Sequence, residues 1–542
     1  MSSSPWEDPS LAAAFPAAGA VPERFRVDPA AHPARWLVDG ELRRFPGPSR
    51  TVTSRVALAG GGPLRPTPLG EEALLTAAEA SLALAAAQRA YDGGEGAWPR
   101  ASVEERFEAV RRFAAALEAR VDEVATLLMW EIGKPWPSAR DEVTRSVEYI
   151  RNTLAEFGAL RDAEGQVQRG TAGQKTHLAR THRRSLGVVL CVAPFNYPVN
   201  EFLTTVVPAL LMGNVVLAKT PRHGVLANLV LAQAFRDCFP PGVVSLLPGE
   251  GRVVLPALMA ATRRDLWGHP VGAIDVLAFI GSESAANAIL KAHPVPITLH
   301  KVLGLGAKNL AVVLPGADLD AAAAALTRGA LGFNGQRCTA EKLVLAHEAV
   351  ADALVERLAA RVAALKAGAP WEEGVAITPL PEDGKLEAMR ALLDDAVGRG
   401  ARVHNPGGGQ GTFSLMRPAV VYPVAEGMRL WHEEQFGPLL PVGRFAREAE
   451  VLEWQRRSPY GQQAAVWGPV EAARSLVRAL MRSVARVNFN DVCQRGPDSF
   501  GFTATDKSGF GTLSLREALL SFSRPVLVQS PDAAALDVLS PP

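Results

Sequence analysis

Hydrophobic and polar positions alternate along this chain in two different ways. In residues 71–90, 102–130 and 138–160, apolar side chains recur at three- and four-residue spacing, which is the period of an amphipathic helix. After a polar segment at 174–184 the pattern changes to short apolar runs rich in β-branched residues, which favour strands. The pattern therefore predicts three helices followed by a region that contains a sheet.

The short apolar runs form two series, separated by helical stretches. The runs lie at 187–193, 214–218, 243–247 and 275–280 in the first series, and at 310–314, 342–346, 419–422, 464–467 and 486–489 in the second. Strands that alternate with helices are typical of a doubly wound parallel sheet. At 36–41, Trp-Leu-Val-Asp-Gly-Glu predicts a further strand that ends in an Asp-Gly turn. The expected fold class is α/β, with two doubly wound domains in tandem.

Residues 1–34 form a Pro/Ala-rich leader, for which the composition predicts no defined structure. This segment contains no basic region followed by an apolar run, so it does not resemble a secretory signal. The longest apolar run, 202–217, contains Pro208, Gly213 and Asn214 and is too short to span a bilayer. We therefore expect a soluble, cytoplasmic protein without a membrane partner.

Composition and charge exclude several classes of function. The 542 residues are 48% hydrophobic with a mean hydropathy of +0.07, which excludes a disordered chain, and the length exceeds what one core supports. The 57 Lys and Arg balance 56 Asp and Glu, so no overall field attracts a nucleic acid or an anionic membrane. The four cysteines lie far apart, without a Cys-x-x-Cys pair or a Cys/His cluster, which predicts neither a disulfide framework nor a metal site.

Four short motifs carry side chains suited to chemistry. Gly335-Gln-Arg-Cys-Thr339 places Cys338 between an Ala-rich helix and a strand, and Ala193-Pro-Phe-Asn-Tyr-Pro198 fixes Asn196 in a stiff turn, where its amide can donate to a developing oxyanion. Lys219 ends a predicted strand, at the edge where open α/β sheets bind ligands. Glu433-Glu-Gln-Phe-Gly-Pro438 sets two carboxylates beside an aromatic ring. Each motif alone is also compatible with a structural role, as a buried cysteine, an Asx turn or a solvated charge.

Together and in this order, the motifs resemble those of the aldehyde dehydrogenase superfamily. The similarity extends over residues 35–530 and includes Phe279-Ile-Gly-Ser282, Leu303-Gly-Leu-Gly-Ala-Lys308 and Lys507-Ser-Gly-Phe-Gly511. It implies a cofactor-binding domain (35–162 and 187–303), a catalytic domain (304–511) and a small β oligomerisation element. A β-hairpin at 163–186 and a strand in 512–535 would form this element, which implies a homodimer or homotetramer.

The resemblance also implies a role for each motif residue. Cys338 is the nucleophile, and its backbone N–H and the Asn196 amide hold the oxyanion that forms when the thiolate attacks an aldehyde. Hydride then passes to a nicotinamide and leaves a thioester. The implied cofactor contacts are Lys219 at the adenosine ribose, Ser282 at the pyrophosphate, Glu434 at the nicotinamide ribose and Phe436 beside it.

Arg222 bears on the choice of cofactor. It lies three residues past Lys219, where NAD-preferring members of the superfamily often carry a Glu that accepts from the ribose 2′-hydroxyl. A guanidinium at this place attracts a 2′-phosphate, which a carboxylate would repel. We expect NADP as the cofactor, with NAD as the alternative if Arg222 only faces solvent.

Within the superfamily, the chain is most similar to the non-phosphorylating, NADP-dependent glyceraldehyde-3-phosphate dehydrogenases. Three segments carry this similarity: Pro194-Phe-Asn-Tyr-Pro-Val-Asn200, Gly335-Gln-Arg-Cys-Thr-Ala340 and Gln494-Arg-Gly-Pro-Asp-Ser-Phe500. The implied phosphate-binding set is Arg145, Tyr197, Arg337 and Arg495, with Thr339 nearby. Because one guanidinium does not offset the desolvation of a phosphate dianion, such a set favours a phosphorylated aldehyde, with glyceraldehyde 3-phosphate as the first candidate.

One residue of the family pattern is missing. The general base is a Glu in a Glu-Leu-Gly-Gly-Lys motif, and this position holds Gly304, whereas Gly306 and Lys308 keep their places. Three alternatives follow. Another group, such as His300, His432 or Glu433, positions water for slow hydrolysis; or the acyl group passes to CoA or phosphate, as in the CoA-acylating semialdehyde dehydrogenases, which also lack the Glu; or the chain is a catalytically impaired relative.

Overall fold

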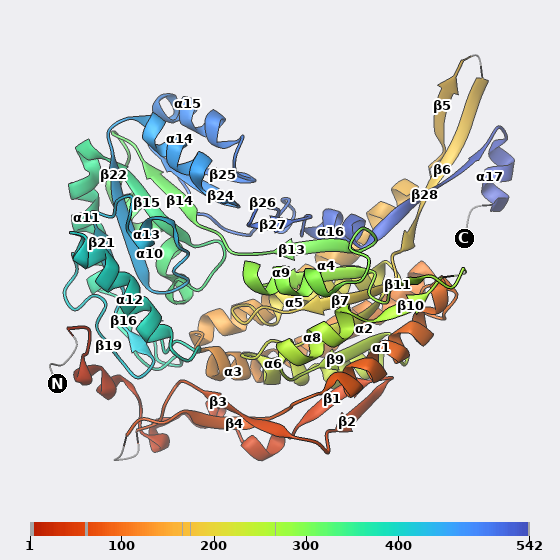
Figure 1. Cartoon of the computed structure of the whole chain (residues 1–542), viewed down its shortest axis with the longest axis horizontal. Coiled ribbons are helices and arrows are strands. Elements are labelled where there is room, and N and C mark those ends of the chain that lie inside the picture. Colours follow the sequence, from red (N-terminus) through yellow and green to blue (C-terminus); the bar gives the residue numbers. More distant parts are fainter. Residues whose placement is uncertain (1–4, 60–62, 165, 174, 266, 540–542) are drawn as a thin grey trace.

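The computed structural model describes residues 5–59, 63–164, 166–173, 175–265 and 267–539. Residues 1–4 of the expected leader, and residues 165 and 174 of the expected hairpin region, lie outside this description. Two large sheets, each covered by helices, make up most of the molecule, and a small sheet projects from one end (Figure 1).

The first large sheet has the strand order β2-β1-β9-β8-β7-β12-β13-β27. Strands β9, β8, β7, β12 and β13 are parallel. Strand β1 pairs antiparallel with β9, β2 pairs antiparallel with β1, and β27 pairs antiparallel with β13. The strands are β1 (Arg35–Val38), β2 (Glu41–Arg44), β7 (Val188–Val192), β8 (Val215–Lys219), β9 (Val244–Leu247), β12 (Val276–Ile280), β13 (His300–Gly304) and β27 (Gly509–Phe510). Chain order reverses between β7 and β12, and ligands bind at such a reversal in open α/β sheets.

Helices cover both faces of this sheet, and their apolar side chains pack against it in one large hydrophobic core. They are α1 (Ala77–Tyr91), α2 (Val103–Glu118), α3 (Val121–Ile132), α4 (Trp136–Glu164), α5 (Asn200–Leu211), α6 (Val225–Leu229), α7 (Ala232–Cys238), α8 (Gly251–Met259) and α9 (Glu283–Ala292). Two hairpins lie beside the sheet, β3 (Ser49–Ser54) with β4 (Thr67–Ala73) and β10 (Thr262–Arg264) with β11 (Pro270–Gly272).

The second large sheet has the order β18-β21-β22-β15-β14-β24-β25, parallel except for β18. Its strands are β14 (Asn309–Val313), β15 (Glu341–His347), β18 (Arg402–Val403), β21 (Ala419–Tyr422), β22 (Leu439–Phe445), β24 (Gln463–Trp467) and β25 (Arg486–Phe489). Its helices are α10 (Leu319–Leu331), α11 (Glu348–Ala363), α12 (Lys385–Gly398), α13 (Arg429–His432), α14 (Glu448–Arg457) and α15 (Val470–Leu480). Short strand pairs complete it: β16 (Lys366–Ala367) with β17 (Val375–Ile377), β19 (Gly411–Thr412) with β20 (Leu415–Met416), and β23 (Tyr460–Gly461) with β26 (Thr505–Asp506).

The small sheet has the order β28-β6-β5 and stands away from both large sheets (Figure 1). Strand β5 (Gln168–Ala172) and the long strand β6 (Lys175–Ser185) form a hairpin, and β28 (Ser523–Ser530) pairs antiparallel with β6. Helices α16 (Leu515–Ser521) and α17 (Ala533–Leu539) flank β28. The predicted small β element is thus present, and its role in oligomerisation stays a prediction.

Most predicted elements are confirmed, and the exceptions have physical reasons. The helix expected at 102–130 is two helices, α2 and α3, which meet at Ala119 and Arg120 without a Gly or Pro to mark the break. Residues 71–73 of the first expected helix belong to strand β4, because their pairing with β3 outweighs their helical pattern. The Asp-Gly turn between β1 and β2 is confirmed, with both residues at positive φ.

The prediction of no defined structure for the leader is wrong for its described part. Residues 5–34 form the 3₁₀ helices η1 (Pro9–Ala14), η2 (Ala18–Ala20), η3 (Glu23–Phe25) and η4 (Pro29–Ala31). Leu11 and Phe15 pack into a cluster with Ile377 and Leu415 of the second domain, and Phe25 is buried in the core of the first. Burial of these scattered apolar side chains, rather than local propensity, orders the segment.

Across the described ranges, no helix is both long enough and apolar enough to cross a membrane.

Candidate active site

A cavity of about 890 Å³ is lined by residues of both large domains. The loops that follow β7 and β12, on the two sides of the chain reversal, contribute to it. Most of the predicted site residues line it: Arg145, Asn196, Tyr197, Ser282, Gly304, Arg337, Cys338, Thr339, Glu434, Phe436 and Arg495. Residues from seven segments far apart in sequence therefore meet in one place, as the motifs predicted.

Cys338 follows a tight turn that the backbone fixes firmly. Phe333, Asn334 and Gly335 all have positive φ, at 51°, 55° and 73°. A Cβ on Gly335 would lie 2.5 Å from the Gly437 carbonyl oxygen, so only glycine fits at this position. The Asn334 amide Nδ2 donates to the carbonyl oxygen of Thr378 at 3.0 Å, and Oδ1 accepts from the Thr378 N–H at 3.1 Å. These contacts lock the turn that delivers Cys338.

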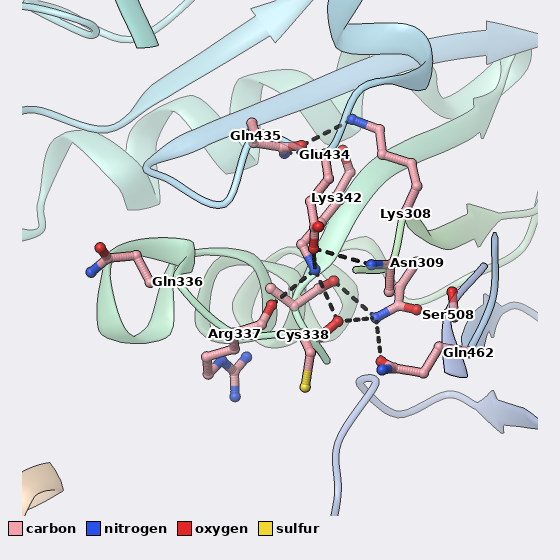
Figure 2. Close-up of polar contacts among 12 residues, drawn as sticks. Lys308, Asn309, Gln336, Arg337, Cys338, Lys342, Glu434, Gln435, Gln462 and Ser508 are labelled. Atoms are coloured by element: carbon pink, nitrogen blue, oxygen red, sulfur yellow. Dashed lines mark hydrogen bonds and ion pairs between the residues drawn. The ribbon is translucent and has the colours of Figure 1, made fainter. Parts of the chain in front are cut away.

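Hydrogen bonds also fix the peptide groups around Cys338. Its carbonyl oxygen accepts from Asn309 Nδ2 at 2.9 Å and from Lys342 Nζ at 2.9 Å. In Figure 2 the sulfur points away from this cluster of hydrogen bonds. Burial raises the pKa of the Cys338 thiol, and the carboxylate of Glu201 adds to the rise, so the cysteine is held mainly as a thiol at neutral pH.

Asn196 lies in the loop after β7, with its amide close to the Cys338 turn. Nδ2 donates one hydrogen to the carbonyl oxygen of Gln336 at 2.9 Å, which leaves its second hydrogen for a ligand. Lys134 Nζ donates to the Asn196 carbonyl oxygen at 2.9 Å and pairs with buried Glu142. Glu142 in turn accepts from the Val199 N–H at 3.0 Å. The oxyanion donor proposed from the sequence is thus held in a fixed orientation.

On the other side of the cavity lie groups suited to a nucleotide. Ser282 is the N-cap of α9 and accepts from the Ala285 N–H at 3.3 Å, so this helix N-terminus borders the cavity. Glu434 Oε1 pairs with Lys342 at 3.0 Å and accepts from the Ala307 N–H at 3.2 Å. A helix N-terminus binds phosphate and a carboxylate binds ribose hydroxyls, so these residues fit a dinucleotide.

Lys308 lies next to Glu434 and holds its loop in place. From the sequence alone, this residue served only to align the motif that contains Gly304. Its buried Nζ donates to the Glu433 carbonyl oxygen at 2.6 Å and to Gln435 Oε1 at 2.9 Å, on either side of Glu434 (Figure 2). Burial, together with the charge of Lys342, lowers the pKa of Lys308 to about 7. Lys308 therefore fixes the loop that carries Glu434 into the cavity.

Two predicted cofactor residues lie outside this cavity. Lys219, at the end of β8, is buried, and its Nζ donates to the Thr220 carbonyl oxygen at 2.6 Å; burial lowers its pKa to about 8. Arg222 is 60% exposed, pairs with Asp383 at 3.6 Å, and borders a separate hollow of about 100 Å³ with His223. An exposed guanidinium leaves Arg222 able to meet a 2′-phosphate, and its assignment stays a prediction.

The arginines implied for the substrate phosphate already contact carboxylates or a backbone carbonyl of the protein. Arg495 pairs with Glu201 and lies 3.7 Å from Asp498, while Arg145 lies 3.6 Å from Asp498. Arg337 donates to the Gly329 carbonyl oxygen. Nevertheless Arg495 Nη2 and Arg337 Nε are buried without a hydrogen-bond partner, and an anionic group in the cavity would satisfy such donors.

Gly304 ends β13 and borders the cavity, so the position expected to carry a base carries no side chain. Of the three substitutes considered from the sequence, His300 and His432 are not among the residues that line the cavity. Glu433 does line it, but both its carboxylate oxygens accept from Arg429 at 2.8 Å. The described residues contain no group of three or more His, Cys, Asp or Glu that could hold a metal ion.

Glu201 is the residue that sequence reasoning missed. It lies in the first turn of α5, it is 8% exposed, and it lines the cavity together with Cys338. The signal available in the sequence was the only charged residue of a mostly apolar helix, five residues after Asn196.

Comparisons with known proteins agree with this geometry. Residues 61–528 match the sequence profile described as "Aldehyde dehydrogenase family". The chain is 35% identical over 429 residues to an NADP-dependent glyceraldehyde-3-phosphate dehydrogenase of Streptococcus equinus, covering 78% of this chain and 86% of that protein. It is 32% identical over 430 residues to the protein of the same name from Pisum sativum, covering 78% and 82%.

A solved structure resembles the fold closely. It is the NADP-dependent glyceraldehyde-3-phosphate dehydrogenase of Bacillus halodurans C-125 in complex with NADP, at 31% identity and a TM-score of 0.82. The match covers 92% of this chain and 99% of that chain.

Proposed function

Because the chain belongs to the aldehyde dehydrogenase family, we propose that it oxidises a phosphorylated aldehyde, such as glyceraldehyde 3-phosphate, to the acid with NADP. The observation that carries the proposal is the meeting of Cys338, the Asn196 amide and the N-terminus of α9 in one cavity. The relatives' names and the NADP complex support the cofactor and the substrate class.

The residues proposed to hold NADP are the α9 N-terminus at Ser282, Glu434 with Phe436, and, for the adenosine end, Lys219 and Arg222. The helix N-terminus suits the pyrophosphate, and the exposed Arg222 guanidinium suits a 2′-phosphate. NAD remains the alternative cofactor, because Arg222 already has a carboxylate partner in Asp383.

In the first half-reaction, Cys338 Sγ attacks the aldehyde carbon as a thiolate. The oxyanion that forms is held by the Asn196 amide and the Cys338 backbone N–H, which the surrounding hydrogen bonds keep in place. The raised pKa of Cys338 keeps the thiolate fraction small before substrate binds. When bound, NADP supplies the acceptor for the hydride that the thiohemiacetal loses, and this loss leaves an acyl thioester on Cys338.

For the substrate phosphate, we propose Arg145, Tyr197, Arg337 and Arg495, with Thr339 nearby. The unpartnered Nη2 of Arg495 and Nε of Arg337 offer donors in a buried setting, where charge-assisted bonds are strong. Glu201 and Asp498 reduce the net positive charge of this pocket, so binding depends on directed hydrogen bonds more than on overall charge.

One experiment tests this function. The protein is mixed with NADP and D-glyceraldehyde 3-phosphate, and NADPH is followed through the first turnover and into the steady state. We expect a burst of one NADPH per active site followed by steady turnover in buffer. A burst without turnover that CoA or phosphate then releases identifies an acyl transferase instead, and the absence of a burst, with no alkylation of Cys338 by iodoacetamide, rejects both.

A further inference from the structure

We propose that Glu201 is the general base that activates water for thioester hydrolysis, in place of the carboxylate missing at position 304. This inference rests on the proposed function, because it requires an acyl group on Cys338. It explains how hydrolysis proceeds although Gly304 offers no proton acceptor.

The backbone places Glu201 beside the reacting groups. Its N–H donates to the Tyr197 carbonyl oxygen at 3.1 Å, so Glu201 lies one helical turn after the loop that holds Asn196. The side chain is 8% exposed and lines the same cavity as Cys338 and Asn196. A carboxylate in this place can reach a water molecule that borders an acyl group on Cys338.

The two carboxylate oxygens of Glu201 differ in their surroundings. Oε2 pairs with Arg495 Nη1, and Arg495 is itself fixed 4.8 Å from the Phe502 ring centroid. Oε1 receives no hydrogen bond from any residue in the described ranges. One oxygen therefore anchors the side chain while the other remains available to accept a proton, which is the arrangement that a base requires.

Each of the other carboxylates that line the cavity has a basic partner that is not one of the arginines proposed for the substrate. Glu283 pairs with Lys507 at 3.1 Å, Glu382 with Lys385 at 3.4 Å, and both oxygens of Glu433 accept from Arg429. Glu434 pairs with Lys342 and is assigned to the nicotinamide ribose. Glu201 is thus the carboxylate on the substrate side of the cavity, next to the arginines proposed for the substrate.

The electrostatics agree with this placement. After burial itself, Glu201 has the largest effect on the pKa of the Cys338 thiol, ahead of Lys342, Arg495 and Glu434. Coulomb interactions weaken with distance, so this order agrees with a carboxylate that lines the same cavity as the sulfur.

In the proposed step, water attacks the thioester carbon while Glu201 Oε1 takes one of its protons. The new C–O bond forms as the carbonyl electrons move to the oxygen, which Asn196 Nδ2 and the Cys338 N–H stabilise. The C=O bond then re-forms and the C–S bond breaks, so the acid leaves and sulfur departs as thiolate. Glu201 returns its proton to the sulfur, and one water is consumed for each thioester.

The test uses an ester, so that it does not depend on NADP. Cys338 reacts with 4-nitrophenyl acetate to release nitrophenolate in a burst, and the acetyl-enzyme then hydrolyses in the steady state. In Glu201→Gln we expect the burst to persist, the steady-state rate to fall roughly 100-fold, and acetyl-enzyme to accumulate in the mass spectrum. Glu201→Asp keeps the charge beside Arg495 and should lose less of the steady-state rate.

Two further variants make the result specific. Glu164→Gln is the matched control, because Glu164 is also 8% exposed and pairs with an arginine, Arg161, at 3.2 Å; it should behave as wild type. Adding Gly304→Glu to Glu201→Gln should restore steady-state hydrolysis.

The possible outcomes separate this inference from the proposed function. An unchanged steady-state rate in both Glu201 variants overturns the inference, and so does loss of the burst together with the steady state. Wild-type protein that is acetylated but never turns over in buffer also overturns it. Failure of the proposed function is distinct, because it appears as no NADPH burst from wild-type protein with the aldehyde, whatever happens to the ester.

Discussion

The turn at Cys338 and the strand end at Gly304 border the same cavity but are fixed to different degrees. At the turn, three successive residues hold positive φ, Asn334 is tied to Thr378, and Gly335 has no room for a side chain. At Gly304 the backbone is ordinary strand, and a Cβ would meet only Ile280, at 3.4 Å. A Cβ is therefore excluded at Gly335 but makes only ordinary contacts at Gly304.

This difference separates the two half-reactions. In the proposed mechanism, thioester formation depends on groups that the backbone and its hydrogen bonds hold, namely the Cys338 N–H and the anchored Asn196 amide. Hydrolysis needs only a proton acceptor near water, which a side chain on another element can supply. The group that supports the second half-reaction can therefore come from different positions in the fold.

The largest expected effect comes from the nucleophile. Cys338→Ser should abolish the NADPH burst and lower kcat/KM by at least roughly 1000-fold, because an alcohol is far less ionised than a thiol near neutral pH. Single-turnover kinetics measure the burst, and thermal unfolding checks that the turn is intact. A burst of wild-type amplitude would show that another residue forms the covalent bond.

The oxyanion donor should rank next. Asn196→Ala removes the amide and should lower kcat by roughly 100- to 1000-fold, with a small effect on substrate KM, because the amide acts mainly on the developing charge. Steady-state kinetics with the aldehyde give both parameters. If KM rises while kcat holds, Asn196 binds substrate rather than the transition state.

A pair of glycine substitutions tests the contrast in rigidity directly. Gly335→Ala forces a side chain against the Gly437 carbonyl oxygen at 2.5 Å in a left-handed conformation, and should cost about 2–4 kcal/mol of unfolding free energy. Gly304→Ala meets only Ile280 and should change it by less than about 1 kcal/mol. Urea unfolding measures both, and equal effects would show that the backbone constrains the two positions equally.

Restoring a carboxylate at the permissive position should have a moderate effect. The Cβ of Gly304→Glu would make ordinary contact with Ile280, and the variant should raise the steady-state rate roughly tenfold where hydrolysis limits turnover, by adding a second proton acceptor. The burst should become less distinct from the steady state as deacylation speeds up. Unchanged or slower turnover would show that water does not approach the thioester from this strand.

The smallest effect concerns the ionisation of Cys338. Burial raises its pKa and Glu201 adds to the rise, so alkylation by iodoacetamide should be slow at neutral pH and should accelerate as the pH increases and thiolate forms. Glu201→Gln removes a negative charge that opposes the thiolate, so its profile should shift to lower pH. A profile that does not move would place Glu201 too far away to act on the sulfur.

The sequence predicted the parts of the fold that depend on local pattern. The β-branched runs that became β7, β8 and β12 alternate with apolar helices and end in the motif residues of the site. Strand β22 was not predicted, because Pro441 and Gly443 interrupt its apolar run, and its pairing with β15 and β21 overrides that signal. The ordered leader was not predicted either, since its partners lie hundreds of residues away.

The site shows the same limit. Residues with a distinctive motif, such as Cys338 and Asn196, could be assigned by similarity and are found in the cavity. Glu201 belongs to no recognised motif. Its environment depends on Arg495, which lies 294 positions further along the chain. Lys219 and Arg222 were assigned by motif alone and lie outside the cavity, so their cofactor contacts stay a prediction.

The empty space at Gly304 has a genetic consequence. Every glycine codon becomes a codon for aspartate or glutamate by one change at its second base, and a Cβ at position 304 would meet Ile280 at an ordinary contact distance of 3.4 Å. An acidic side chain at this strand end is thus within reach of a single point mutation that the backbone would tolerate. Growth selection on aldehyde oxidation could recover it without prior design.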